Sequence, residues 1–576
     1  MKITEISIKK FRSIDKAEIN INNINAIVGE NNSGKSSLLR ALNAFFNFED
    51  EKSNFYYEIH RYIPRSIPKI AITFSDLPDD PELQQYINNE QLNVEITFNP
   101  RNQKRTFKYK SNGGYQNCEK NIINIIKRHI SYIFIPPNRD GKQLIDTENN
   151  ILRLLLEAYL DGATQNRDNY SAKFQLAAKF LESNALSKIA IQAKKEYALN
   201  NQFDFEIKLK ESLTYKDYLS NMSISIEEHG LVHSLIECGS GVQSLTIIAL
   251  YSLLGKLKNE NIVIGLEEPE TNLHPQAQRE IIFAFNKLVK EQKILQFFFT
   301  THSSELIDQV DHSQVTLYRK HADTKRGFKS SVSKVPHDFF EKYNLNEFKY
   351  YQFHRYRNSE FFFSKFIVIV ESKNEIEVIK TLLKKSDISL ELSGISFFNL
   401  SGIDNIRYPI FLLEELKIPY LLIVDKDFFV PYIGDKLEDS RSDDGFPKYR
   451  YEYKNVDIIS KLITSSIKRD ELLNLLRTNY TRASELLEQY NIISMRYCLE
   501  MDLVATSKGK EQYYDILNIP ETNRCTKTIL VDNHKSSKKI RNILKITQET
   551  ELRNLPFSYR RIRSYLIQKC KELQNA

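Results

Sequence analysis

The sequence predicts an α/β protein with two separate sheets, and three observations support this fold class. A glycine-rich loop follows a short apolar run and precedes a predicted helix near residue 30. Apolar runs typical of buried strands end in acidic residues at two distant places, near residues 267 and 425. Strand–helix alternation runs to about residue 318 and begins again at Phe366. Because the chain has 576 residues, we expect about three or four domains.

The composition is that of an ordinary globular protein. Hydrophobic residues make up 41% and charged residues 27%, so we do not expect wholesale disorder. The net charge of +7 permits nucleic-acid binding without requiring it. The five cysteines include no CxxC pair, which argues against a disulfide framework or a zinc site and favours a reducing cytoplasm. No apolar run approaches the roughly 18–20 residues that span a bilayer, so we expect no membrane partner.

The order of these patterns divides the chain into five segments. We expect the first part of one α/β domain over 1–147, a mostly helical insertion over 148–222, and the second part of that domain over 223–335. A junction rich in Phe and Tyr follows over 336–364, and a second α/β domain with a helical C-terminal extension occupies 365–576. The segment 148–222 is charged and has few glycines, and it separates two halves of one motif set. It is therefore a candidate insertion.

The first motif is Gly-Glu-Asn-Asn-Ser-Gly-Lys-Ser over 29–36, which fits GxxxxGK[ST] between an apolar strand and a helix. Glycines let backbone N–H groups turn inward around phosphate oxygens, and the helix N-terminus adds favourable partial charge. Lys35 would neutralise the outer phosphates of a nucleotide, and Ser36 would hold Mg²⁺. We expect nucleotide contacts from Gly29, Asn31, Asn32, Ser33, Gly34, Lys35, Ser36 and Ser37.

Two later strands end in side chains suited to phosphate chemistry. An apolar strand over 262–266 delivers Glu267, which could reach Mg²⁺ through its water shell, and Glu268, which could polarise the attacking water. Another apolar strand, over 297–301, ends at His302, which could contact the γ-phosphate. Each of these features alone is also explained as an ordinary strand end.

A second small-residue loop, Gly-Ser-Gly-Val-Gln-Ser over 239–244, precedes an apolar helix, so Ser240 and Gly241 are candidates for a further anion contact. Taken alone, this loop is equally well explained as a flexible connection. In this order the four pieces resemble the ABC ATPase family, although the loop departs from the LSGGQ signature. The opening Ile8–Ser13 and the segment 272–275 are similar to SMC and RecF-type heads. In that family one subunit's signature loop completes another subunit's nucleotide site, so the resemblance implies a dimer, with the helical insertion as a dimerisation element.

A second acidic set follows two further apolar runs. One run ends at Glu371 and turns into a helix bearing Glu375, and about fifty residues later another ends at Asp425, with Asp427 two residues on. If the strands are parallel neighbours, these acids gather at one carboxyl edge of the sheet. Close carboxylates cannot all stay charged without a cation, and oxygen ligands suit Mg²⁺ or Mn²⁺. Taken singly, each acid is also explained as a surface residue at a strand end.

This segment resembles a TOPRIM domain, which has a strand followed by Glu and a strand followed by DxD, with Ser372 here replacing the usual glycine. An ABC head followed by a TOPRIM domain resembles the OLD (overcoming lysogenization defect) family of ATP-linked nucleases, which includes the nuclease subunit of the Gabija antiphage system. The resemblance covers residues 1 to about 430, and more loosely the rest of the chain, and it implies further acids, for which Glu500 and Asp502 are candidates. It also implies a lysine, for which Lys535, Lys538 and Lys539 compete equally.

The resemblance implies an ATP-regulated, divalent-metal-dependent DNA endonuclease of bacterial antiviral defence, working as a homodimer or higher homo-oligomer. The partners it suggests are DNA and either a helicase-like defence protein or a retron reverse transcriptase. The basic segment 559–563 could contact a phosphate backbone, although basic helical faces are usually just solvated. Two alternatives stay open. One is a RecF/SMC-like DNA-binding ATPase with an inactive TOPRIM domain, and the other is a topoisomerase-like enzyme, which needs a nucleophilic tyrosine among the 31 present.

Overall fold

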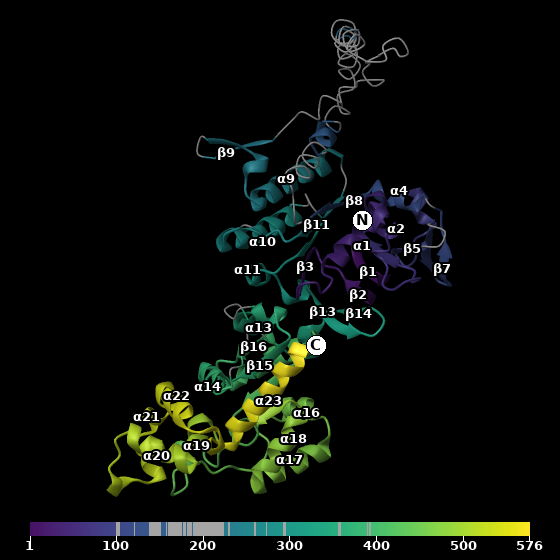
Figure 1. Cartoon of the computed structure of the whole chain (residues 1–576). Helices are drawn as coiled ribbons and strands as arrows, with labels where there is room; N and C mark the ends of the chain where they lie inside the picture. The colour runs from purple at the N-terminus through teal and green to yellow at the C-terminus, as the bar shows by residue number, and fades with distance from the viewer. Residues whose placement is uncertain are drawn as a thin grey trace, which may run out of the picture. The chain divides into compact units, whose positions relative to one another are not determined.

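The computed structural model describes most of the chain outside the predicted insertion. The described residues are 1–99, 104–119, 121–136, 151–156, 224–228, 231–258, 261–271, 273–291, 295–354, 359–386 and 393–575, with the single positions 158, 176, 180, 187, 388 and 390. The expected helical insertion over 148–222 therefore lies almost entirely outside the described residues. The chain divides into two compact units, Met1–Val332 and Ser333–Ala576, which we describe separately (Figure 1).

The first unit is built on a mixed sheet of 12 strands in the order β7-β6-β5-β4-β1-β2-β14-β13-β3-β12-β11-β8. The strands are β1 (Lys2–Phe11), β2 (Ile14–Asn20), β3 (Ile24–Gly29), β4 (Lys69–Ser75), β5 (Leu92–Asn99), β6 (Lys104–Ser111), β7 (Gly114–Asn117), β8 (Ile130–Ile135), β11 (Asn261–Glu267), β12 (Gln296–Thr300), β13 (Val315–Asp323) and β14 (Gly327–Lys334). A separate two-stranded sheet pairs β9 (Ser225–Glu228) with β10 (Leu231–Ser234).

One half of this sheet is parallel, and it carries the nucleotide motifs. Strands β13, β3, β12, β11 and β8 all pair in parallel, with Phe297 opposite Ile24 and Ile264 opposite Phe297. Strands β3 and β12 are buried along their whole length, which explains their continuous apolar sequence. The carboxyl ends of these strands therefore lie along one edge, as the sequence predicts.

The other half of the sheet is antiparallel. Strand β1 pairs with β2 and β4, and β5, β6 and β7 follow as a meander. One core cluster joins both halves, with Ile6, Phe45 and Phe74 among its fully buried members. The described helices of this unit are α1 (Ser36–Phe46), α2 (Phe48–Tyr56), α3 (Pro81–Gln84), α4 (Ile122–Lys127), α9 (Ser240–Lys258), α10 (Pro275–Lys290) and α11 (Ser304–Ile307).

The second unit contains a four-stranded, fully parallel sheet in the order β16-β15-β17-β18. Its strands are β15 (Phe366–Val370), β16 (Ile395–Asn399), β17 (Tyr420–Val424) and β18 (Ile492–Ser494). Its described helices are α12 (Phe339–Lys342), α13 (Glu347–His354), α14 (Lys373–Lys384), α15 (Arg407–Glu415), α16 (Val456–Leu462), α17 (Ser466–Thr478), α18 (Tyr480–Glu488), α19 (Leu499–Val504), α20 (Ser507–Ile516), α21 (His534–Ser537), α22 (Ile540–Glu549) and α23 (Phe557–Asn575). The predicted α/β fold with a helical C-terminal part is confirmed.

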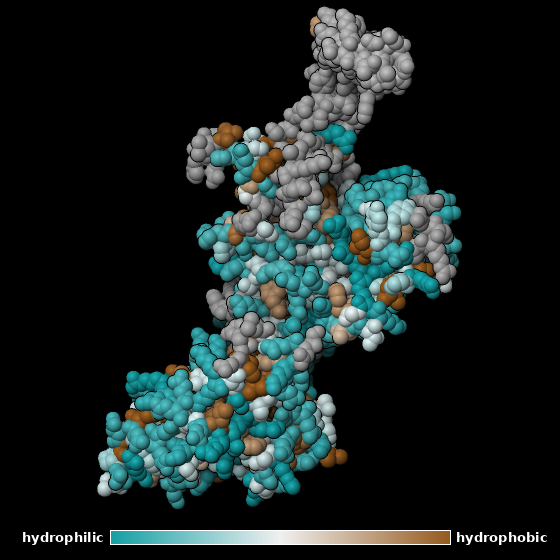
Figure 2. Space-filling model, in the orientation of Figure 1, coloured by the Kyte–Doolittle hydropathy of each residue, from teal (hydrophilic) through white to brown (hydrophobic). Residues whose placement is uncertain are grey.

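The aromatic segment expected as a junction belongs to this second unit. Phe353 stacks on Phe398 of β16 with ring centroids 5.8 Å apart, and Tyr343 stacks on Phe411 of α15 at 4.3 Å. On the face that Figure 2 shows, the described surface is mostly hydrophilic, with apolar residues in small groups. Among the described residues, no helix is long and apolar enough to cross a membrane.

Candidate nucleotide and metal sites

The glycine-rich loop lies between β3 and α1, where its two glycines adopt conformations that other residues rarely take. Gly29 has φ +144° and Gly34 has φ +96°, and a Cβ on Gly29 would lie 2.1 Å from the Tyr318 carbonyl oxygen. The Lys35 ammonium donates to the carbonyls of Gly29 at 3.0 Å and Glu30 at 2.8 Å. The loop is thus preformed, with its lysine directed back over it.

The parallel strands bring the predicted ATPase residues to this loop. Glu268 directly follows β11 in a left-handed conformation, φ +47°, and its N–H donates to the Thr300 carbonyl at 3.0 Å. The Glu268 carboxylate lies 4.0 Å from Nε2 of His302. Lys35 acts electrostatically on His302, and Glu268 acts on both. Glu268, His302 and Lys35 therefore gather at one place, although they come from three separate stretches of sequence.

Burial sets the protonation of these groups. It lowers the pKa of Lys35 to about 8, even though Glu268 acts in the opposite direction. Burial and the nearby Lys35 also lower the pKa of His302. Burial raises the pKa of Glu267, while a hydrogen bond from Ser36 opposes that rise. Oε1 of Glu267 is buried without a hydrogen-bond partner, so the Ser36–Glu267 pair suits a divalent cation.

One acid of this site was missed from the sequence. Glu270 is buried beside the His302 segment, where its Oε1 accepts from the Thr301 hydroxyl and the His302 N–H, both at 2.7 Å. Its Oε2 is buried without a hydrogen-bond partner, and burial raises the pKa of this carboxyl. Glu270 thereby fixes the backbone that presents His302. Only the three-dimensional pairing of β11 with β12 reveals this role.

The second small-residue loop also has the predicted local form. Ser240 begins α9, and Gly241 lies in its first turn. The side-chain amide of Gln243 donates to the Cys238 carbonyl at 2.9 Å and thus closes the loop before the helix. Of the segment 272–275, position 272 lies outside the described residues.

In the second unit, the acids predicted at the sheet edge come together. Glu371 follows β15 and Asp425 follows β17, and these strands are parallel neighbours with Ile367 opposite Tyr420. Asp427 lies two residues on, in a short 3-10 helix. Glu500 lies in the first turn of α19, which follows β18. The carboxyl ends of three adjacent strands therefore supply this cluster.

These carboxyls perturb one another strongly. Burial raises the pKa of Glu371 to about 7, with further contributions from Asp427 and Glu375. Burial also raises the pKa of Asp425 well above its ordinary value, reinforced by Glu371, Asp427, Glu375 and Glu500. These mutual effects agree with the placement of the acids at the carboxyl ends of adjacent strands. The cluster is therefore short of positive charge.

The residues present fit a divalent metal by the chemistry of their donor set. Oε1 of Glu500 is buried without a hydrogen-bond partner, and the surrounding acids are all hard oxygen donors. In the described part of the chain, no three or more His, Cys, Asp or Glu side chains converge with the spacing of metal ligands. The cluster thus supplies oxygen donors and negative charge at one edge of the sheet, without the ligand spacing of a formed metal site.

Two of the predicted metal ligands have structural partners. Both oxygens of Asp502 are engaged: they accept from the N–H groups of Arg496 at 3.0 Å and Tyr497 at 2.8 Å and from the Ser558 hydroxyl at 2.5 Å. Oε2 of Glu375 closes a capping box with Ser372 at the start of α14. Asp502 is therefore engaged within the fold, whereas Glu375 adds negative charge beside the cluster.

The structure distinguishes the three competing lysines. The ammonium of Lys538 lies 3.7 Å from Oε1 of Glu500 and acts electrostatically on Asp427. No such pairing with the cluster is found for Lys535 or Lys539 in the described residues.

Two further neighbours of the cluster could not be predicted from the sequence. Lys454 opposes the raised pKa values of both Glu371 and Asp427. The Tyr432 hydroxyl hydrogen-bonds Asp427. Both residues lie in the irregular segment between β17 and α16, where no strand or helix pattern marks them.

The basic segment 559–563 is partly used inside the fold. Tyr559 is fully buried and donates to the Leu499 carbonyl at 3.1 Å. Arg561 pairs with Glu488, and Arg563 donates to the Ser386 hydroxyl at 2.6 Å. These contacts favour a structural role for this part of α23 over phosphate binding.

Two families match the chain. The family described as "AAA domain, putative AbiEii toxin, Type IV TA system" matches residues 24–308, and that described as "Overcoming lysogenization defect protein-like, TOPRIM domain" matches residues 362–427. Endonuclease GajA of Bacillus cereus is 24% identical over 458 residues, covering 74% of this chain and 75% of that protein. OLD nuclease of Thermus scotoductus is 21% identical over 451 residues, covering 74% and 82%. An SMC head domain from Thermotoga maritima is 17% identical, covers 58% of this chain and 100% of that chain, and has a TM-score of 0.31.

The two family matches cover the two sites described above. The first spans the glycine-rich loop, Glu268 and His302, and the second spans Glu371 and the Asp425–Asp427 pair. Nucleotide use and divalent-metal use follow from these two domain types. The chain combines an AAA ATPase domain with an OLD-like TOPRIM domain and is homologous to the GajA and OLD nucleases.

Proposed function

We propose that this protein is an ATP-regulated, divalent-metal-dependent DNA endonuclease. The observation that carries the proposal is the gathering of Glu371, Asp425 and Asp427 at the carboxyl ends of adjacent parallel strands, with Glu500 beside them. These acids raise one another's pKa values and so favour a bound cation. The homologues named as nucleases support phosphodiester cleavage as the reaction.

Mg²⁺ or Mn²⁺ bound by this cluster would neutralise a phosphodiester and activate water. Glu371, Asp425, Asp427 and Glu500 would hold the metal. Lys538, whose ammonium lies 3.7 Å from Glu500, would stabilise negative charge that develops on the phosphate. The Tyr432 hydroxyl would hold Asp427 in place.

ATP would act as the control on cleavage. Lys35 would bind its outer phosphates, and Ser36 with Glu267 would hold the accompanying Mg²⁺. Glu268 would polarise the attacking water, while His302 would contact the γ-phosphate. Ser240 and Gly241 at the start of α9 would complete the nucleotide site of a second copy, with the segment 148–222 supporting a homodimer. Slow hydrolysis would suit a switch.

The biological role that fits these sites is bacterial antiviral defence, with a helicase-like protein or a reverse transcriptase as the partner. Expression of the chain with its neighbouring genes should reduce phage plaque formation. The same cells carrying Asp425→Ala should be fully sensitive. Protection that survives this substitution would separate defence from the proposed nuclease site.

The decisive biochemical test is plasmid cleavage by the full chain. Supercoiled DNA is incubated with the protein and Mg²⁺ or Mn²⁺, with and without ATP, and conversion to nicked or linear forms is followed. Asp425→Ala should abolish cleavage. Glu377→Gln, an exposed carboxyl on α14 of the same unit, is the matched control and should cleave normally. Cleavage that survives Asp425→Ala would reject the assigned site, whereas ATP-dependent DNA binding without any cleavage would favour a RecF/SMC-like structural ATPase.

A further inference from the structure

Two hydroxyl groups from outside the glycine-rich loop hold its backbone. Oγ of Ser330 on β14 lies 2.5 Å from the Ser33 carbonyl oxygen and 2.6 Å from Oγ of Ser13. A hydroxyl has one proton to donate, so Ser330 can donate to Ser33 while the Ser13 hydroxyl donates to Ser330. Ser13 and Ser330 are 4% and 5% exposed, so water does not compete for these bonds.

The glycine-rich loop packs closely against this pair of hydroxyls. Gly34 has φ +96°, and a Cβ placed on it would lie 2.3 Å from Oγ of Ser13 and 2.6 Å from Oγ of Ser330. Both distances are well inside van der Waals contact. The peptide before Lys35 is therefore held between the loop that follows β1 and a strand from the far end of the first unit.

The strand that carries Ser330 also leads out of the first unit. The N–H of Ser330 donates to the Ser13 carbonyl at 2.8 Å, and Ser330 pairs with Ile14 of β2. Two residues later, at Val332, the first unit ends, and β14 continues to Lys334 within the second. Strand β14 thus connects, through the chain itself, the residue that contacts the glycine-rich loop to the second unit.

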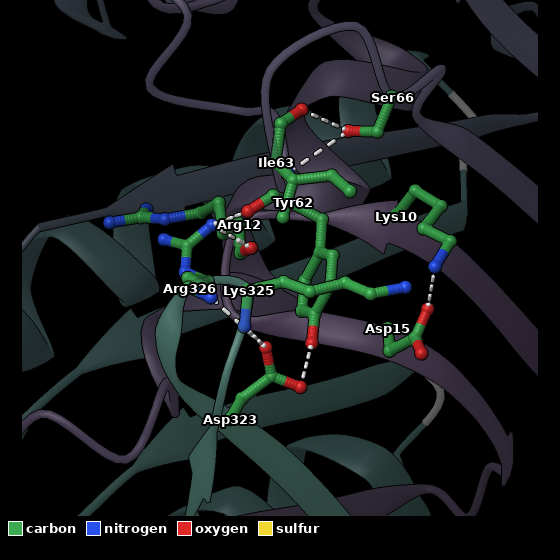
Figure 3. Close-up of polar contacts among 9 residues, drawn as sticks. All are labelled: Lys10, Arg12, Asp15, Tyr62, Ile63, Ser66, Asp323, Lys325 and Arg326. Carbon is green, nitrogen blue, oxygen red and sulfur yellow. Dashed lines mark hydrogen bonds and ion pairs between the residues drawn. The ribbon is translucent and has the colours of Figure 1, made fainter.

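The turn that precedes β14 is anchored as well (Figure 3). The Arg326 guanidinium donates to the carbonyls of Arg12 and Tyr62, the latter at 2.6 Å. It also donates to the Arg61 carbonyl at 2.8 Å. The Tyr62 hydroxyl donates to Asp323 at 3.0 Å. These bonds hold the turn in place. The hydrogen bond from Ser330 to Ser33 therefore joins an anchored strand to the glycine-rich loop.

We infer that Ser330 is a positioning residue for the ATP site, and that nucleotide binding acts through it on β14 and so on nuclease activity. This inference rests on the proposed function. A nucleotide whose phosphates bind the Ser33–Gly34 peptide would therefore act on Ser330 and, through it, on β14. Ser330 is buried, so it acts through the backbone of the loop.

The test compares Ser330→Ala with Ser331→Ala in the full chain. Ser331 is the next residue on the same strand, and its hydroxyl hydrogen-bonds His321 at 2.7 Å instead of the loop. Three quantities are measured: the KM and kcat for ATP, the ratio of plasmid cleavage rates with and without ATP, and the melting temperature. Ser330→Thr keeps the hydroxyl and serves as the rescue variant.

Loss of one buried hydrogen bond should raise the KM for ATP about five- to ten-fold in Ser330→Ala, with kcat changed less than about two-fold. The ATP-dependent ratio of cleavage rates should move towards one. Ser331→Ala should match the unaltered protein, and Ser330→Thr should recover most of both effects. A merely structural role would lower the melting temperature and leave KM and the ratio unchanged.

The outcomes separate the two ideas. If the unaltered protein neither cleaves DNA nor responds to ATP, the proposed function fails and the inference fails with it. If the unaltered protein does both and Ser330→Ala behaves identically, the inference alone is overturned. Should Ser330→Ala not fold, Ser330→Cys, whose thiol is a weak donor, replaces it under the same criteria.

Discussion

The two units place carboxylates in the same way and neutralise them differently. In each, acids lie at the carboxyl ends of parallel strands: Glu267 ends β11 and Glu268 follows it, and Asp425 follows β17. The first site contains its own cation, Lys35, folded over the glycine-rich loop within hydrogen-bonding distance. Among the described residues, the second site contains several mutually repelling acids, and the exposed lysines Lys454 and Lys538 lie at its border.

This difference indicates which partner each site requires. A loop with a built-in lysine and inward N–H groups is prepared for an anion. A cluster in which burial and neighbouring acids raise the pKa values of Glu371 and Asp425 is prepared for a cation. The same sheet-edge geometry therefore supports nucleotide binding in one unit and metal binding in the other.

The strongest test of this difference between the two sites is to replace the central acid of the cation-binding site. Asp425→Asn should lower DNA cleavage by about 1,000-fold or more, because the proposed metal would lose the ligand at the centre of the acid cluster. ATP hydrolysis should stay within about two-fold, since Asp425 lies in the other unit. Both rates are measured on the same preparation. A parallel loss of ATP hydrolysis would show that the sites do not act separately.

The pKa of one buried acid in the first unit is shifted in the opposite direction to the pKa values of the acids in the second. Burial acts to raise the pKa of Glu51, but hydrogen bonds from His60, Asn43 and Arg40 outweigh it and lower that pKa to about 2. The folded pKa is below the ordinary 4.5, so the ionised carboxylate stabilises the fold above about pH 4.5. That stabilisation is lost as the pH falls towards 2.

We expect Glu51→Gln to destabilise the α1–α2 region by about 3 kcal/mol at pH 6 and by roughly half of that at pH 3. Hydrogen exchange of peptides from this region, corrected for intrinsic rates, measures the difference at each pH. Glu49→Gln, an exposed acid on the same helix, should change little. Equal destabilisation by Glu51→Gln at both pH values would contradict the assigned ionisation.

The anion-binding site should tolerate loss of an acid more than loss of its cation. Glu268→Gln should reduce the kcat of ATP hydrolysis about 100-fold, because it removes the group that polarises water. ATP binding should be retained, since Lys35 and the loop are intact. Rapid-quench hydrolysis and equilibrium binding of ATP measure the two effects, with Glu280→Gln on α10 as the exposed control. Normal turnover in Glu268→Gln would reassign the water-activating role.

Much of this arrangement was predictable from the sequence, because a buried parallel strand leaves a continuous apolar run that ends at its functional residue. That pattern located Glu268, His302, Glu371 and Asp425, and the parallel register of β15 with β17 confirmed the expected neighbours.

Contacts between residues that are far apart in the chain are not marked by any such sequence pattern. Ser330 meets Ser33 across 297 positions, and Glu270 supports the His302 backbone from a different strand end. Glu500 and Asp502 lie two residues apart in one short helix, and only the N–H groups that engage Asp502 show that their roles differ.

Removal of the lysine that borders the cation-binding site should give the smallest of these effects, and it tests whether that site also contains a lysine with a specific role. Lys535, Lys538 and Lys539 are all exposed and equivalent in sequence, yet only the Lys538 ammonium is paired with the described acid cluster, 3.7 Å from Glu500. Because Lys538 is exposed, water screens its charge, so Lys538→Ala should lower DNA cleavage only about ten-fold at saturating Mg²⁺. Lys535→Ala and Lys539→Ala, measured in the same plasmid assay, should stay within about two-fold.

If all three lysines contribute equally, the lysines act as a diffuse basic surface for DNA, and raising the salt concentration should then erase their effects together. A selective loss in Lys538→Ala that persists at higher salt would instead place one cation at the reacting phosphate, so that the second site, like the first, contains a lysine with a specific role.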